Sequence, residues 1–186
     1  SANSPTGLSR QAKVHETSFG QQLHGPTQNL EYRVSQHARS NFGSLVDRGA
    51  NGGIAGSDMR VISKTERQVD VTGIDDHQMT GLHIVTAGGV APTQRGEVLL
   101  VFNQYAHLPH GKTIHSPCDL EAFENHVRDK SCHFDNNGQR IITLHGHVIP
   151  LDMRNGLPYL PMRPYTDHEF DSLPHVTMTS DVLWDP

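Results

Sequence analysis

Cysteine, basic residues and long apolar stretches are all scarce in this sequence, and each shortage excludes a class of protein. The two cysteines, Cys118 and Cys132, are too few for a disulfide scaffold in 186 residues. With 15 Lys and Arg against 20 Asp and Glu, and no basic run, the chain lacks the positive footprint of a nucleic-acid binder. No apolar stretch approaches membrane-spanning length, and no charged start precedes an apolar run. We therefore expect a cytoplasmic chain with reduced thiols and without nucleic-acid or membrane partners.

Glycine and proline are plentiful, with 17 and 11 copies, while 34% of the residues are hydrophobic. This composition is typical of short strands joined by many turns, so we expect a mainly β fold. Residues 1–30 are rich in Ser, Gln, Thr, Asn and Gly, and their few apolar residues follow no period. Such a segment predicts a polar linker. We expect one domain over residues 31–165 and a C-terminal extension over residues 166–186.

Two segments carry strong secondary-structure signals. Residues 97–102 are apolar on both faces, which predicts a central buried strand. Ser116 is suited to cap a helix that has Pro117 in its first turn and Asp119 near the exposed amides. Three apolar residues follow at helical spacing and predict a helix to about residue 129: Leu120, Phe123 and Val127.

Two Asn-Gly pairs predict tight hairpin turns in the second half of the chain, because both central residues of such a turn need positive φ. Asn137-Gly138 separates residues 132–134 from residues 141–144. Asn155-Gly156 separates residues 149–151 from residues 157–160, and the prolines there predict strands at a sheet edge.

The stretch with the clearest chemical content is Leu45-Val46-Asp47-Arg48-Gly49-Ala50. Two apolar residues end a strand and carry one carboxylate into a small, glycine-bearing turn. Aspartic peptidases use two such carboxylates that share a proton, one as base toward water and the other as acid toward the carbonyl. The chain has a single motif of this kind, so the second carboxylate must come from another copy across a two-fold axis.

The order of elements around this motif resembles the retropepsin-type protease of Copia-type retrotransposons, over roughly residues 40–165. In that family a glycine-bearing flap hairpin follows the Asp turn, and a buried strand then leads to an apolar pair before the single helix. Residues 84–90 resemble the flap, residues 98–101 the strand, and Thr113-Ile114 with Ser116 the approach to the helix.

This resemblance implies a retropepsin-like half-barrel with one short helix, working as a homodimer without a cofactor. Asp47 would be the catalytic residue, and the substrate would be the element's own polyprotein in the cytoplasm or in virus-like particles. Four residues would line the substrate site: Gly49, Ala50, Gly88 and Gly89.

The sequence departs from the family at two positions. Arg48 stands where the family has a Ser or Thr whose hydroxyl braces the pair of carboxylates, and His115-Ser116 stands where it has Gly. Two symmetry-related guanidinium groups would repel each other or need acidic partners, and Arg48 would favour the fully ionised pair. An alternative is therefore a catalytically inactive retropepsin-like module that serves in folding or dimerisation.

Other interpretations stay open beside these. Asp47 can be an ordinary strand-end residue that caps a turn. Four glycines, at 49, 52, 53 and 56, fit neither phosphate-binding fingerprint. The 14 histidines allow a metal-binding β domain, although their spacing is looser than zinc sites use. The two candidate sets are His107, His110, His115 with Cys118, and His145, His147 with Cys132 and His133.

Overall fold

The computed structural model describes residues 44–73, 78–130 and 138–186, and these residues form a mainly β structure with two short helices. The expected mainly β class is confirmed. Residues 42–69 and 81–186 belong to one compact unit. Residues 70–80, of which the structure describes 70–73 and 78–80, are assigned to a second unit. The linker expected at residues 1–30 lies outside the described residues.

The described residues form twelve strands and two helices. The strands are β1 (Ser44–Val46), β2 (Ile54–Ala55), β3 (Arg60–Thr72), β4 (Gln78–Thr93), β5 (Gly96–His107), β6 (Ile114–His115), β7 (His126–Arg128), β8 (Arg140–Ile142), β9 (Val148–Pro150), β10 (Asp152–Arg154), β11 (Leu157–Leu160) and β12 (His175–Thr177). The helices are α3 (Pro117–Ala122) and α4 (Asp167–Ser172). None of the described helices is long and apolar enough to cross a membrane.

Nine strands form one mixed sheet in the order β10-β11-β1-β6-β2-β5-β4-β3, with β12 paired to β5 outside this path. Within the described residues the sheet is open, since β10 and β3 end the path. The remaining strands, β7, β8 and β9, form a separate antiparallel sheet. The chain therefore has no closed barrel in its described part.

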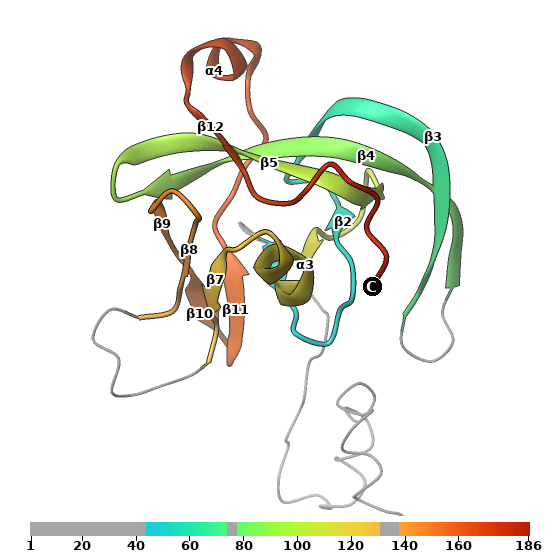
Figure 1. Ribbon diagram of the computed structural model, residues 1–186, viewed down its shortest axis with the longest axis horizontal. Coiled ribbons are helices and arrows are strands. Elements are labelled where there is room, and N and C mark those ends of the chain that lie inside the picture. The colour runs from blue at the N-terminus through green and yellow to red at the C-terminus, as the bar shows by residue number, and fades with distance from the viewer. Residues whose placement is uncertain (1–43, 74–77, 131–137) are drawn as a thin grey trace, which may run out of the picture. The chain divides into compact units, whose positions relative to one another are not determined.

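Strand β5 is the centre of the core, as its continuous apolar run predicts. It pairs antiparallel with β4 and parallel with β12, and successive side chains point to opposite faces. Leu100 and Phe102 join a large apolar cluster that contains Leu120 of α3. Leu99 joins a second cluster, against which Phe170 of α4 packs. The two helices accordingly cover opposite faces of the β4–β5 ribbon (Figure 1).

Residues 166–186, expected as an extension, continue the same folded unit. Strand β12 adds to β5 with Val176 opposite Leu100, and Met178 is fully buried in the main cluster. Helix α4 begins with a reciprocal capping box in which the Thr166 hydroxyl accepts from the Glu169 amide and the Glu169 carboxylate accepts from the Thr166 amide.

The predicted helix begins where expected but is half as long. Ser116 caps it by accepting from the Asp119 amide, and Pro117 occupies its first turn. The helix ends at Ala122, since Glu124 has a φ of 62° and takes the chain into a left-handed turn. Val127, expected on the helix, lies buried in β7 instead, so the prediction of a helix to residue 129 is wrong.

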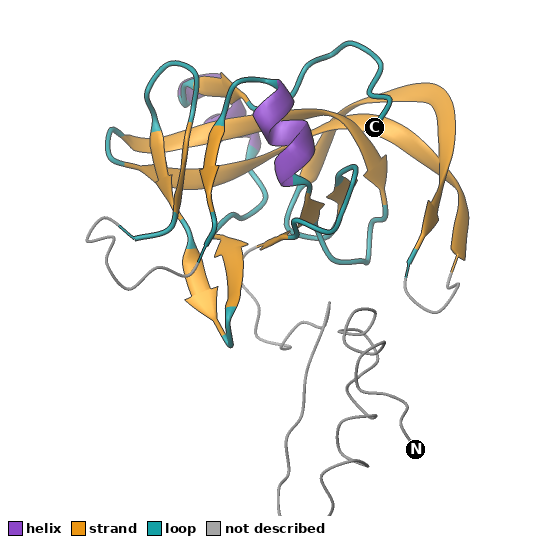
Figure 2. Ribbon diagram, turned by 60° about the horizontal axis from the view of Figure 1, so that its bottom comes forward, coloured by secondary structure: helices purple, strands orange, loops and turns teal. Residues whose placement is uncertain are grey.

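The Asn155-Gly156 turn is confirmed. Both residues have positive φ, 50° and 78°, and Arg154 of β10 lies opposite Leu157 of β11. The ribbon shows antiparallel strands joined by short turns (Figure 2). The strand before the turn is β10, however, whereas residues 148–150 form β9 and pair with β8. The other predicted hairpin falls partly on residues 131–137, outside the described residues, although Gly138 has the expected positive φ of 71°.

Candidate active site at the Asp47 loop

The loop of residues 47–53 joins β1 to β2, and the strand that lies between these two is β6. Strand β6 runs parallel to β1, with Val46 opposite His115, and antiparallel to β2. The loop must therefore pass over the end of β6, where the chain turns into α3. This crossover presents Asp47 at the end of a buried strand, as the sequence pattern predicts.

Asp47 is fixed by three short hydrogen bonds. Its amide donates to the carbonyl oxygen of His115 at 2.9 Å, and its own carbonyl oxygen accepts from the Ala50 amide at 2.9 Å. The Gly49 amide donates to carboxylate atom Oδ1 of Asp47, also at 2.9 Å. Within the described residues this is the one hydrogen bond found to that carboxylate. The same geometry is that of an Asp capping a turn.

The rest of the loop is tied to three other parts of the fold. The Ser116 hydroxyl donates to the carbonyl oxygen of Ala50 at 2.8 Å, and the Trp184 indole N–H donates to that of Asn51 at 2.7 Å. Gly53 packs so closely on the Tyr105 ring that an added Cβ would lie 2.3 Å from ring carbons. A loop with this many attachments holds its carboxylate in a defined position.

Arg48 forms two ion pairs within the chain. Its guanidinium donates to both carboxylate oxygens of Glu121 at 3.0 Å, and to those of Asp129 at 3.0 and 3.1 Å. These bonds raise the pKa of Arg48 further above its ordinary value, with the larger contribution from Glu121. The acidic partners that sequence reasoning required for Arg48 are therefore present in the same subunit.

Lys112 is a residue of this site that sequence reasoning missed. Its ammonium nitrogen is buried and has no hydrogen-bond partner in the described part of the chain. Burial lowers the pKa of Lys112 to about 8, and the nearby negative charge of Asp47 opposes that shift. Asp47 thus interacts electrostatically with Lys112, whereas the recorded partners of Arg48 are Glu121 and Asp129. No local pattern marks it, because its position comes from the pairing of β1 with β6.

Beneath the loop lie three buried polar side chains. The Tyr105 hydroxyl and His115 Nδ1 share a hydrogen bond of 2.8 Å, whereas His115 Nε2 has no partner among the described residues. Burial lowers the pKa of His115 to about 3, so this imidazole is neutral. Asp119, which is 3% exposed, has a pKa that burial raises to about 7. None of the three was expected to be buried.

A half-buried carboxyl group, Asp58, joins the start of β1 to the segment before β6. It accepts from the hydroxyls of Ser44, at 2.8 Å, and Thr113, and Thr113 in turn accepts from the Gly56 amide. Desolvation raises the pKa of Asp58, and the two hydroxyl donors oppose the shift. Both its oxygens are engaged, so we assign Asp58 a structural role that keeps β1 and β6 in register.

The flap expected at residues 84–90 is absent from that position. Gly88 and Gly89 lie in the buried middle of β4, where they pair with Val101 and Leu100 of β5. An added Cβ on Gly89 would lie 2.4 Å from Met162, so these glycines make room for the core. Residues 74–77, between β3 and β4 in the chain, lie outside the described residues. The assignment of Gly88 and Gly89 to a flap is wrong because they are covered on both faces.

The histidines do not converge on a metal centre in the described residues. No group of three or more His, Cys, Asp or Glu side chains there has the arrangement of a metal site. His115 is committed to Tyr105, and Cys118 is exposed with a free thiol. His145 and His147 lie in a turn rather than on one face of a strand, and their expected companions, Cys132 and His133, lie outside the described residues.

Comparisons with protein-family models, with curated proteins and with solved structures find no match to this chain.

Proposed function

We propose that the chain is an aspartic endopeptidase of the retropepsin type that works as a homodimer, with one Asp47 contributed by each subunit. The observation that carries the proposal is the position of Asp47. It ends a buried strand, its Oδ1 accepts from the Gly49 amide, and the described residues provide no hydrogen bond to its Oδ2. Two such carboxylates side by side share one proton and activate water against a peptide carbonyl.

The surroundings of the loop support this function over an ordinary capped turn. A capping Asp needs only its own turn, whereas this loop is attached to β6, α3 and Trp184. Such redundancy is expected where a carboxylate must stay in place with little error. Gly49 and Ala50 keep the space beside Asp47 small and would contact the peptide backbone. The substrate we propose is a retrotransposon polyprotein, cut between its segments.

Arg48 is compatible with this chemistry because Glu121 and Asp129 compensate its charge. In place of the Ser or Thr hydroxyl that stabilises the carboxylate pair in the family, Arg48 would stabilise the loop through ion pairs to α3 and to the segment after β7. Lys112 is the cation that acts on the catalytic pair. With a pKa of about 8 it is largely charged in the acidic range.

The second candidate is an inactive dimerisation module with the same fold, and the observation that favours it is also Lys112. A buried ammonium beside two carboxylates promotes loss of the shared proton that the reaction needs. The candidates differ in one substitution. Lys112→Met leaves the activity of a working enzyme within the same order of magnitude, whereas it creates activity in a chain that the ammonium has silenced.

The direct test of the proposal is peptide cleavage. The full chain is incubated at pH 5 with a mixture of unstructured peptides, and the products are identified by mass spectrometry. We expect internal cleavage that disappears in Asp47→Asn and persists in Asp152→Asn, an exposed carboxylate on β10 that serves as the matched control. Cleavage that survives Asp47→Asn, or no cleavage by a folded wild-type chain and its Lys112→Met variant, rejects the enzyme.

A further inference from the structure

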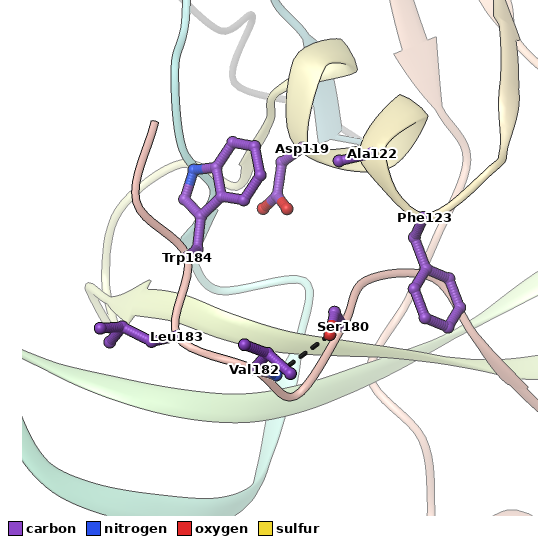
Figure 3. A pocket seen from close by; sticks show the side chains of 7 residues that line it. All are labelled: Asp119, Ala122, Phe123, Ser180, Val182, Leu183 and Trp184. Carbon is purple, nitrogen blue, oxygen red and sulfur yellow. Dashed lines mark hydrogen bonds between the residues drawn. The ribbon is translucent and has the colours of Figure 1, made fainter.

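A cavity of about 200 Å³ lies between α3 and the last residues of the chain, 180–186, which we call the C-terminal strap (Figure 3). Cavities of roughly this size hold a small organic group such as benzene. The walls are mostly apolar and come from both segments: Ala122, Phe123, Val182, Leu183 and Trp184, together with Ser180. The cavity takes no part in the cleavage mechanism proposed above.

The floor of the cavity holds a carboxyl group with an unused oxygen. Asp119 is 3% exposed and points from α3 into the space beside the Trp184 ring (Figure 3). Its Oδ2 is buried and has no hydrogen-bond partner in the part of the chain that the structure describes. A buried carboxylate without a partner costs several kcal/mol, roughly, so such groups are normally paired. This one lacks its pair within the described residues.

The residues around the cavity entrance are apolar or acidic, which suits a ligand with a positive group at the end of an aliphatic chain. Val182 and Leu183 are large and apolar, yet 69% and 56% exposed. The strap also carries Asp181 and Asp185 and contains no Lys or Arg. An aromatic ring beside a carboxylate is a favourable environment for a cation. The site therefore offers an apolar entrance, an aromatic wall and an anionic end.

From these features we propose that the cavity binds the side chain of a lysine or arginine carried by a peptide. The ammonium or guanidinium group meets Asp119 Oδ2, and the methylene stem lies between Trp184 and the apolar rim. This assignment is independent of the proposed peptidase activity. Because the Trp184 indole also bonds the loop carbonyl of Asn51, an occupant of the cavity lies next to the Asp47 loop.

The single tryptophan of the chain gives a direct readout, since one indole N–H resonance reports on one wall of the site. The full chain, labelled with nitrogen-15, is titrated at pH 7.5 with the blocked amino acids Nα-acetyl-lysine and Nα-acetyl-arginine methylamide. Blocked norleucine, which keeps the stem without the charge, is the matched ligand. We expect the basic ligands to shift the Trp184 resonance in a saturable manner and norleucine to bind about tenfold more weakly.

Two variants keep the inference testable if one fails to fold. Asp119→Asn removes the charge, and Ala122→Leu fills the space while leaving the charge in place. Each is expected to weaken the basic ligands by about tenfold or more. Equal binding by either folded variant, or by norleucine, overturns the proposal. Saturation by butylammonium without any response to the blocked amino acids would show a site for free amines and would equally overturn it.

Discussion

The buried pair of Asp119 and His115 leads to a quantitative prediction about stability and pH. Burial raises the pKa of Asp119 from 3.8 to about 7 and lowers that of His115 from 6.5 to about 3. Both groups are therefore neutral in the folded chain between pH 4 and pH 6.5, while both are charged in the unfolded chain. Folding releases a proton from one group and takes up a proton at the other.

The sign of each effect follows from proton linkage. The folded state binds more protons at Asp119, so this group makes the chain less stable as pH rises from about 4 to 7. The unfolded state binds more protons at His115, so this group makes the chain more stable as pH rises from about 3 to 6.5. Each slope is roughly 1.4 kcal/mol per pH unit, and the two oppose each other.

If one of the two groups no longer titrates, the pH dependence of stability that comes from the other group can be measured. Asp119→Asn keeps the shape of the side chain and removes its titration, so the His115 slope remains. Between pH 4 and pH 6.5 the variant should gain roughly 3 kcal/mol of stability relative to wild type. By pH 7.5 the full advantage reaches roughly 4 kcal/mol, which is the free-energy equivalent of a pKa of about 7 against 3.8.

The assay is urea unfolding at fixed protein concentration, followed by far-ultraviolet circular dichroism at pH 4.5, 5.5, 6.5 and 7.5. Ser180→Ala is the control, since it changes the same cavity without removing a titratable group. Its difference from wild type should not vary with pH. A stability difference between Asp119→Asn and wild type that stays constant within about 0.5 kcal/mol would show that the carboxyl group is solvated and would refute the reasoning.

Three further substitutions test the attachments of the Asp47 loop, each by urea unfolding of the folded chain. Arg48→Ser should lower the free energy of unfolding by about 1 kcal/mol, because its ion pairs are partly exposed. In a chain that already carries Glu121→Gln and Asp129→Asn, the same substitution should leave the free energy of unfolding unchanged. Gly53→Ala should lower the free energy of unfolding by about 2 to 3 kcal/mol, because its Cβ would collide with the Tyr105 ring. Gly52→Ala is the control: its Cβ would lie 3.8 Å from the nearest atoms, in the Trp184 ring, and should change the free energy of unfolding by less than about 0.5 kcal/mol. Trp184→Phe should lose about 1 kcal/mol with its indole hydrogen bond, and an unchanged stability would show that this bond does not stabilise the loop.

Local signals were reliable where a short segment decides the structure. Ser116 caps a helix, Asn155-Gly156 forms a turn, and residues 97–102 lie in the central strand. Each of these depends on the backbone preferences or polarity of a few consecutive residues. The T-x-x-E capping box at Thr166 was also readable, yet the helix it starts is too short to show a period.

Errors arose where distant segments decide the outcome. Val127 suits a helix face and a strand equally well, and the turn at Glu124 settles the choice. Gly88 and Gly89 resemble a flexible tip, but pairing with β5 buries them. Arg48 meets partners 73 and 81 residues further along the chain, which no local pattern reveals. Lys112 and Asp119 are charged types whose burial comes from tertiary packing.

The shared active site can be tested by mixing wild type with the Asp47→Asn variant, co-refolding the two in equal amounts and measuring peptide cleavage at pH 5. If one Asp47 from each subunit builds each site, only wild-type pairs are active, and about one quarter of the activity per total protein should remain. A residual activity of about one half would mean that each subunit carries a complete site, and it would contradict the proposal that two copies of Asp47 form one catalytic pair.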